Sequence, residues 1–175
     1  MRLIFSTLLC AAALCAAEGP RRAPGFALPD SKMKVHDLYD YRGKPVIIEF
    51  LKTECPHCAA FADVLARVQQ KYGDKIGILG IANPPDTQTT VGQFIEGHKI
   101  AYPILFDSGQ AAYSYVLKTH LDLPQVFLVD ANGMIYKHFE YDAISKDLFE
   151  GDGLLWELDR MLGPAAKAIP ASKKK

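Results

Sequence analysis

The sequence predicts an α/β sandwich, in which helices cover both faces of a central sheet. Three observations predict this fold class. Apolar runs such as Val46–Leu51 have almost no polar residue on either side, which is typical of strands buried on both faces. Amphipathic patterns with helical spacing, as in Pro56–Tyr72, alternate with these runs. Near the end, an Asn132-Gly133 turn joins two apolar runs into a hairpin, and a last helical pattern follows.

The first 17 residues are predicted to be a secretory signal peptide. Met1–Arg2 gives a positive start, and Leu3–Ala17 is apolar, rich in small residues and too short to anchor the chain in a membrane. Cys10 and Cys15 each follow a leucine rather than the small residue typical of lipid attachment, so we expect no lipid anchor. The sequence therefore predicts an exported protein, periplasmic or otherwise extracytoplasmic, with no membrane span in its mature chain.

The rest of the chain predicts one domain over residues 18–163 and a flexible, lysine-ended tail over residues 164–175. The 20 basic and 20 acidic side chains balance each other. This balance gives no reason to expect a nucleic acid or an anionic membrane as a partner. We expect a monomer.

The elements are predicted in a definite order. Two short strands (26–28 and 33–35) flank a turn, and one helical turn follows at 37–41. The buried strand 46–51 leads into the helix 56–72, which Gly73 ends. A second buried strand (76–81) follows, and Pro84-Pro85-Asp86 breaks the chain and caps a helix at 87–96. Then come a strand at 102–106, a helix at 110–117, hairpin strands at 126–130 and 134–139, and a helix with an apolar stripe from Leu154 to Leu162. We expect Trp156 and the tyrosines to pack in the C-terminal core.

Cys55-Pro56-His57-Cys58 is the principal candidate site. A strand that delivers two cysteines, two residues apart, to a helix N-terminus is how proteins build a reversible dithiol/disulfide switch. Once the signal segment is removed, Cys55 and Cys58 are the only cysteines. A disulfide that closes so short a loop would stabilise the fold little, so a redox role is favoured over a structural crosslink.

Cys55 is expected to be the nucleophile of this pair. Unpaired N–H groups at a helix N-terminus favour a thiolate, and Pro56 suits the first turn because it has no N–H. A protonated His57 adds a positive charge, whereas Glu54 opposes it with a negative one. We expect the thiolate to be favoured on balance. Cys58, one turn into the helix, is expected to be the shielded resolving thiol.

Glu49 is the second candidate, because it interrupts an otherwise apolar strand. Ile47, Glu49 and Leu51 point to one side of that strand. A carboxylate in such a run is expected to be buried, and burial raises its pKa toward neutral pH. The alternative is an ionised carboxylate that pairs with a lysine such as Lys52 or Lys75.

The order of these elements, with a CxxC motif opening the first long helix and a proline opening the late hairpin, resembles the thioredoxin fold over Ala23–Leu162. That fold is a three-layer α/β/α sandwich. The extra N-terminal strands and the central α/β insertion at 102–117 are similar to the exported TlpA/ResA branch, which is related to the AhpC/TSA proteins. The Glu-Phe pair ahead of Cys-Pro-His-Cys is similar to DsbA-type oxidases.

The resemblance implies an exported thiol–disulfide oxidoreductase. Its partners would be protein clients that bear thiols or disulfides, together with a redox partner that recycles the active-site disulfide. It implies no cofactor and no metal. The TlpA/ResA-like scaffold favours a reductase and the Cys-Pro-His-Cys motif an oxidase, so the direction stays open.

The resemblance also assigns roles to individual residues. Glu49, six residues before Cys55, matches a buried acid that moves protons to and from the inner thiol. Pro124 stands where the family has a cis proline beside the CxxC motif, in a loop that pairs with the client backbone. Its neighbours Leu123 and Gln125 are then expected to bind clients.

The sequence departs from the family at three positions near the CxxC motif and Pro124. Glu54 replaces the tryptophan that usually precedes the first cysteine, Leu51 replaces an aromatic residue, and Gln125 stands where threonine is common. These changes leave the dithiol chemistry intact. They make the surface around Cys55 more acidic.

Two alternatives remain. In the first, Cys55 reduces peroxides through a sulfenic acid, although Lys52 stands where the peroxiredoxin pattern has a threonine. In the second, Cys55, Cys58 and His57 carry copper or zinc. Tetrahedral zinc usually needs four ligands. The remaining histidines are scattered singly and are expected to be surface or hydrogen-bonded residues: His36, His98, His120 and His138.

Overall fold

The computed structural model describes residues 21–118 and 121–163. The predicted signal peptide (1–17) and tail (164–175) lie outside the described residues. The strands are β1 (Ala27–Pro29), β2 (Val35–Asp37), β3 (Val46–Leu51), β4 (Gly77–Ala82), β5 (Ile104–Phe106), β6 (Gln125–Val129) and β7 (Ile135–Glu140). The helices are α1 (Pro56–Tyr72), α2 (Gln88–Gly97), α3 (Gln110–Val116), α4 (Lys146–Glu150) and α5 (Asp152–Leu162), with short 3-10 turns η1 (Leu38–Tyr41) and η2 (Gly73–Lys75).

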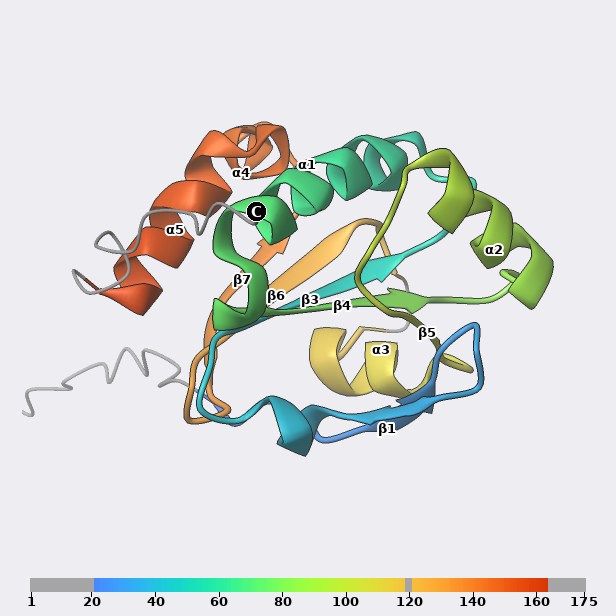
Figure 1. The fold of residues 1–175 in the computed structure, drawn as a ribbon, viewed down its shortest axis with the longest axis horizontal. Helices are drawn as coiled ribbons and strands as arrows, with labels where there is room; N and C mark the ends of the chain where they lie inside the picture. Colours follow the sequence, from blue (N-terminus) through green and yellow to red (C-terminus); the bar gives the residue numbers. More distant parts are fainter. Residues whose placement is uncertain (1–20, 119–120, 164–175) are drawn as a thin grey trace, which may run out of the picture.

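Five strands form one mixed sheet in the order β5-β4-β3-β6-β7. β3, β4 and β5 run parallel, whereas β6 and β7 are antiparallel to their neighbours. Figure 1 shows α1, α2, α4 and α5 on one face of this sheet, and α3 with the N-terminal strands on the other. The predicted three-layer α/β/α sandwich is therefore confirmed. Among the described helices, none combines the length and the apolar character that crossing a membrane requires.

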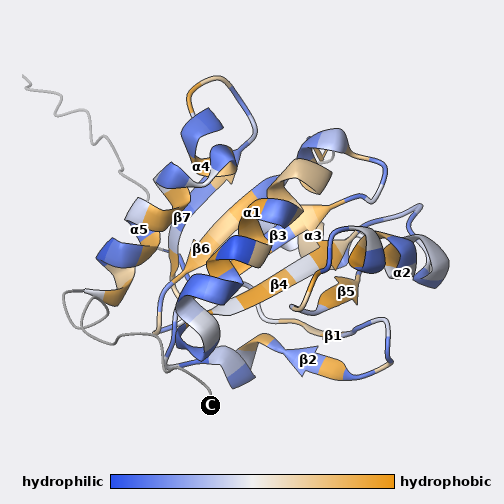
Figure 2. Cartoon of the chain, turned by 45° about the horizontal axis from the view of Figure 1, so that its top comes forward, coloured by the Kyte–Doolittle hydropathy of each residue, from blue (hydrophilic) through white to orange (hydrophobic). Residues whose placement is uncertain are grey.

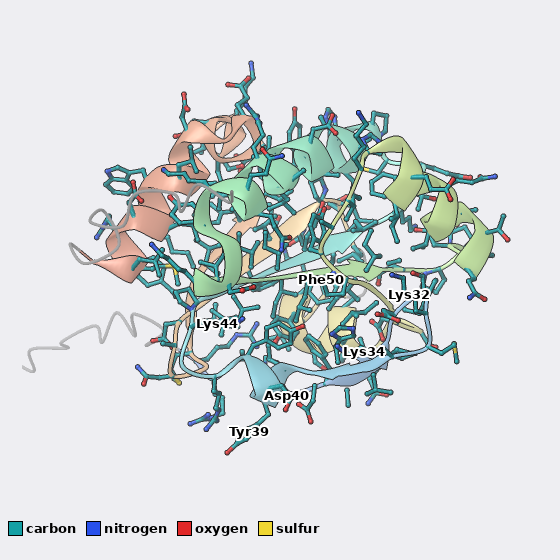
Figure 3. The ribbon with its side chains drawn as sticks, viewed as in Figure 1. Lys32, Lys34, Tyr39, Asp40, Lys44 and Phe50 are labelled. Carbon is teal, nitrogen blue, oxygen red and sulfur yellow. The ribbon has the colours of Figure 1, made fainter. Side chains whose placement is uncertain are left out.

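The central strand β3 divides the core into two halves. Its six residues are all buried. Ile47 and Leu51 pack in the cluster beneath α1, and Phe50 packs in the opposite cluster. Hydrophobic residues concentrate on the strands and on the helix faces turned toward them (Figure 2). In Figure 3, Phe50 lies inside the molecule, whereas Tyr39 projects from the outer edge of the N-terminal layer.

A polar network holds the N-terminal hairpin of β1 and β2 together, and a backbone bridge joins it to the central sheet. The buried His36 ring contacts the Asp30 carboxylate at 2.9 Å and the Tyr41 hydroxyl at 3.0 Å. Asp30 also forms an isolated antiparallel bridge with Leu105 of β5. The hairpin is the extra pair of strands that the sequence predicted, and it packs beside the inserted β5 and α3. Its second strand begins at Val35 rather than at Met33, because Met33 has a positive φ of 63° and belongs to the turn.

Two details differ from the sequence-based expectation. The helix α4 was not predicted, because five residues are too few to show a helical period. Among the tyrosines that were also expected in the core, Tyr39, Tyr113, Tyr136 and Tyr141 are exposed. Trp156 is 57% exposed rather than part of the core. It lies off the stripe formed by Leu154 and Leu158, and the Arg160 guanidinium stacks 4.5 Å from its ring.

The cap of α2 is a further correction. Thr87, not Asp86, occupies the N-cap, and its side chain accepts the N–H of Thr90. The Asp86 carboxylate instead accepts hydrogen bonds from the Thr53 N–H and the Thr90 hydroxyl. Asp86 therefore stabilises the turn that precedes Cys55.

The packing of α1 against α4 yields a stability prediction. Phe61 is fully buried, and its ring centroid lies 5.0 Å from that of Phe149. Phe61→Ala should lower the free energy of unfolding by about 3–5 kcal/mol, because it leaves a cavity in the core. The exposed Tyr113 is the control, since Tyr113→Ala should change it by less than about 0.5 kcal/mol. Equal losses in urea unfolding would contradict this account of the core.

Candidate redox site

Three loops meet where β3 and β4 end and β6 begins. The Asn83 N–H, just after β4, donates to the Leu51 carbonyl at 3.1 Å. Phe50 pairs with Gln125 across β3 and β6, so the Pro124 loop lies beside the end of β3. The Thr53 N–H donates to Asp86 at 2.9 Å, which fixes the turn between β3 and α1. These contacts hold the motif at the carboxyl edge of the parallel strands.

Cys55 is the N-cap of α1, as the motif predicted. Its backbone is extended, and its sulfur accepts the Cys58 N–H at 3.2 Å. The residue is partly exposed, and Pro56 follows in the first helical turn. An N–H group that points at a sulfur at a helix N-terminus stabilises negative charge there. Cys55 is therefore placed to react with a molecule from solvent.

Cys58 lies behind Cys55 and is fully buried. Burial raises the pKa of the Cys58 thiol, and the nearby charge of Glu49 raises it further. A thiol in this position stays protonated and unreactive until another group takes its proton. The two cysteines thus differ in the way that a nucleophile and a resolving thiol must differ.

Glu49 is fully buried, and neither of its carboxyl oxygens has a hydrogen-bond partner. Burial raises its pKa well above the usual range for a glutamate. The alternative of an ion pair with Lys52 or Lys75 is wrong, because a lysine within reach would have satisfied at least one oxygen. Glu49 shares a side of β3 with Ile47 and Leu51, whose cluster also contains Cys58.

The Leu123–Pro124 peptide bond is cis, as the resemblance implied. Pro124 itself is buried, and Leu123 is half-buried. The Leu123 carbonyl oxygen lies 3.8 Å from the Cys55 sulfur, within reach of a weak S–H hydrogen bond. The structure thus brings this loop and the reactive cysteine together.

Gln125 does not fit its expected role in client binding. It is 1% exposed. Its amide N–H donates to the Asp122 carbonyl at 2.7 Å, and its amide oxygen contacts the His138 ring. Both ends of the side chain are therefore occupied inside the protein, and the backbone and Leu123 are the parts of this loop left for a client.

His57 is exposed beside Cys55, and its ring stacks on Tyr141, with centroids 3.9 Å apart and planes 21° apart. Tyr141 in turn packs edge-on against Phe149 of α4. Tyr141 follows β7, so nothing local in the sequence linked it to the motif. Glu54 is exposed and faces solvent ahead of Cys55.

The other histidines are hydrogen-bonded where they are described. His98 contacts the Asp63 carboxylate at 3.0 Å, and His36 and His138 have the partners given above. His120 lies outside the described residues. Within 21–118 and 121–163, no three His, Cys, Asp or Glu side chains gather as metal ligands would. A metal-carrier function would therefore rest on the Cys55 and Cys58 thiols.

The burial of Glu49 predicts how stability depends on pH. A carboxyl whose pKa is raised by folding supports the fold fully below its unfolded pKa of about 4.3, and this support is lost as pH rises. The free energy of unfolding of Glu49→Gln, relative to that of the wild type, should therefore rise between about pH 4 and pH 7. The slope of this rise should be at most about 1.4 kcal/mol per pH unit.

Urea unfolding of the reduced protein across this range measures the effect. Glu96→Gln, which removes an exposed carboxylate from α2, controls for the change in net charge. If Glu49→Gln were less stable than the wild type by the same amount at every pH, Glu49 would be ionised and paired in the folded protein.

Comparisons with known proteins agree with this geometry. The model of the AhpC/TSA family matches residues 20–138. The thiol–disulfide oxidoreductase ResA of Bacillus anthracis is 30% identical over 134 residues, which cover 75% of this chain and 74% of the relative. ResA of Bacillus thuringiensis subsp. konkukian is 28% identical over 133 residues, 74% of each chain.

Solved structures share the fold. A thiol:disulfide interchange protein of the thioredoxin family from Chlorobium tepidum superposes with a TM-score of 0.67 at 21% identity, over 85% of this chain and all of the other. A secreted disulfide oxidoreductase of Mycobacterium tuberculosis gives 0.62 at 21% identity, over 74% of this chain and 95% of the other. The chain belongs to the AhpC/TSA family, as a thiol–disulfide oxidoreductase of thioredoxin fold related to ResA.

Proposed function

We propose that this protein is exported and exchanges disulfides with protein clients through Cys55 and Cys58. The observation that carries the proposal is the asymmetry of the two sulfurs. Cys55 is partly exposed and its sulfur accepts an N–H at the start of α1, whereas Cys58 is buried. An accessible thiolate with a shielded partner is the arrangement that disulfide exchange needs.

In the reducing direction, the Cys55 thiolate attacks one sulfur of a client disulfide. A bond forms between Cys55 and that sulfur, the client S–S bond breaks, and the other client sulfur leaves as a thiolate. Glu49 first loses its own proton to solvent, and the carboxylate that results takes the proton of the Cys58 thiol. The Cys58 thiolate then attacks the Cys55 sulfur. The Cys55–Cys58 disulfide forms, the bond from Cys55 to the client breaks, and the second client sulfur leaves.

In the oxidising direction, the same steps run backwards. A client thiolate attacks the Cys55–Cys58 disulfide, and Cys58 leaves and takes its proton from Glu49. The redox potential of the pair sets the direction. A value near about −270 mV, as in thioredoxin, would mark a reductase, and one near about −120 mV, as in DsbA, an oxidase.

Client proteins are proposed to dock against the loop that contains Pro124. The Leu123 carbonyl already lies 3.8 Å from the Cys55 sulfur, so a client sulfur bonded to Cys55 would lie beside this loop. The half-buried Leu123 offers an apolar contact. His57 and Glu54 are exposed and lie close to Cys55 along the chain, so they would add charge to the surface that a client meets. A separate redox partner would recycle the Cys55–Cys58 pair after each cycle.

Export and the division of the chain are also part of the proposal. The apolar stretch of the first 17 residues supports a signal peptide, and 18–163 would then be the working domain, with 164–175 as a flexible tail. An oxidising compartment outside the cytoplasm is where a protein of this kind meets disulfides. We propose a monomer without a lipid anchor.

A thiol peroxidase is the second candidate, because the family model that matches also describes AhpC proteins. In that reaction the Cys55 thiolate would attack one oxygen of a peroxide, the O–O bond would break, and the other oxygen would leave as water or an alcohol after protonation, so that Cys55 becomes a sulfenic acid. The Cys58 thiol would then condense with this sulfenic acid to give the Cys55–Cys58 disulfide and water. Lys52 stands where the peroxiredoxin pattern has a threonine, which argues against this candidate. Peroxide consumption by the purified protein that is lost in Cys55→Ser would support this candidate.

Trapping tests the roles of the two cysteines. Reduced Cys58→Ala should accumulate a mixed disulfide with insulin, because the thiol that resolves the complex is gone. Reduced Cys55→Ser, which keeps only the buried Cys58 once residues 1–17 are removed, is the matched control and should form no adduct. Non-reducing electrophoresis and mass spectrometry would identify the adduct and the cysteine that carries it. Adducts on Cys58 in the control would overturn the assignment of the nucleophile.

A further inference from the structure

Tyr102 carries a buried hydroxyl that has no hydrogen-bond partner. The residue is 3% exposed, and it precedes β5 in the inserted segment. Two other buried tyrosines differ from it: the Tyr72 hydroxyl donates to Asp159 at 2.9 Å, and that of Tyr115 donates to the Pro24 carbonyl at 2.8 Å. Buried hydroxyls in proteins are normally bonded. The exception at Tyr102 therefore calls for a reason.

The strand register places the Tyr102 ring beside Glu49. Gly80 of β4 pairs with Glu49 of β3, and neighbouring strands lie about 4.8 Å apart. A Cβ atom on Gly80 would lie 3.5 Å from the Tyr102 ring and 3.1 Å from the Leu51 side chain. The ring thus packs over Gly80 on the face of the sheet that Leu51 and Glu49 share. The missing side chain of Gly80 leaves it that space.

The charges around Tyr102 come from two elements. Burial raises the pKa of its hydroxyl, and Glu49 of β3 adds the next largest effect, ahead of Asp63 and Cys58 of α1. Strand β4 contributes no titratable side chain. Asp63 is largely exposed and contacts His98. Glu49 is the buried acceptor, with both oxygens unsatisfied.

We propose that Tyr102 is a positioning residue for Glu49, whose carboxylate accepts a hydrogen bond from the Tyr102 hydroxyl during the resolving step. This inference rests on the proposed function. To take the Cys58 proton, Glu49 must first be ionised in an apolar site, where a carboxylate without a donor is costly. Hydrogen bonds to the charged form favour it. Tyr102 supplies a buried donor with no competing acceptor.

The experiment compares Tyr102→Phe with the wild type. The carboxyl of Glu49 is titrated by NMR in reduced protein labelled with ¹³C in its glutamates. Loss of the hydroxyl should raise the Glu49 midpoint by about one pH unit, the size expected for a hydrogen bond to a charged group. The release of insulin from its mixed disulfide with Cys55 should shift to higher pH by a similar amount. Tyr115→Phe removes a buried hydroxyl on the opposite face of the sheet and should shift neither.

A double variant separates positioning from packing. In a Glu49→Gln background, Tyr102→Phe should have no further effect on the pH profile of release, because its target is gone. An unchanged Glu49 midpoint in folded Tyr102→Phe, or an equal shift in Tyr115→Phe, would overturn the inference. The Glu49 titration does not depend on catalysis. If wild-type protein failed to exchange disulfides, the proposed function would fail while this titration still decided the role of Tyr102.

Discussion

The exclusion of water from the space between β3 and α1 is the constraint on which the site depends. Glu49 and Cys58 are both fully buried there, and burial raises the pKa of each. Each group is therefore held in its neutral, protonated form. If either Glu49 or Cys58 loses its proton, the result is a buried negative charge, which is unfavourable in free energy. The inner half of the site thus stores a proton, and the outer half, at Cys55, meets the solvent.

The fold separates these halves by strand and helix geometry. Strand β3 carries Glu49 in its interior, and the turn after it brings Cys55 to the surface at the N-terminus of α1. One helical turn then returns the chain to the core at Cys58. The Asp86 contact with Thr53 and the antiparallel β6 hold the loops on either side of that turn. The outer sulfur therefore stays partly exposed while the inner one is sealed by the α1 packing.

Much of this arrangement was predictable from the sequence, because it rests on short-range patterns. The apolar residues on both sides of the strand Val46–Leu51 predicted the burial of Glu49, and the apolar spacing after Pro56 predicted α1 to its last residue. Tyr102 and Tyr141 could not be predicted, since their contacts depend on how distant segments pack. Gln125 shows the reverse error. Its place next to Pro124 suggested contact with clients, but the Asp122 carbonyl and the His138 ring satisfy its side chain inside the protein.

The most direct test of the account is the rate at which each cysteine of the reduced, folded protein is alkylated. Iodoacetamide reacts with thiolates, and mass spectrometry of the two modified residues separates their rates. The account predicts that Cys55 is modified in the folded protein and that Cys58 is protected until the protein is unfolded. Equal rates for the two cysteines in the folded protein, or faster modification of Cys58, would contradict it.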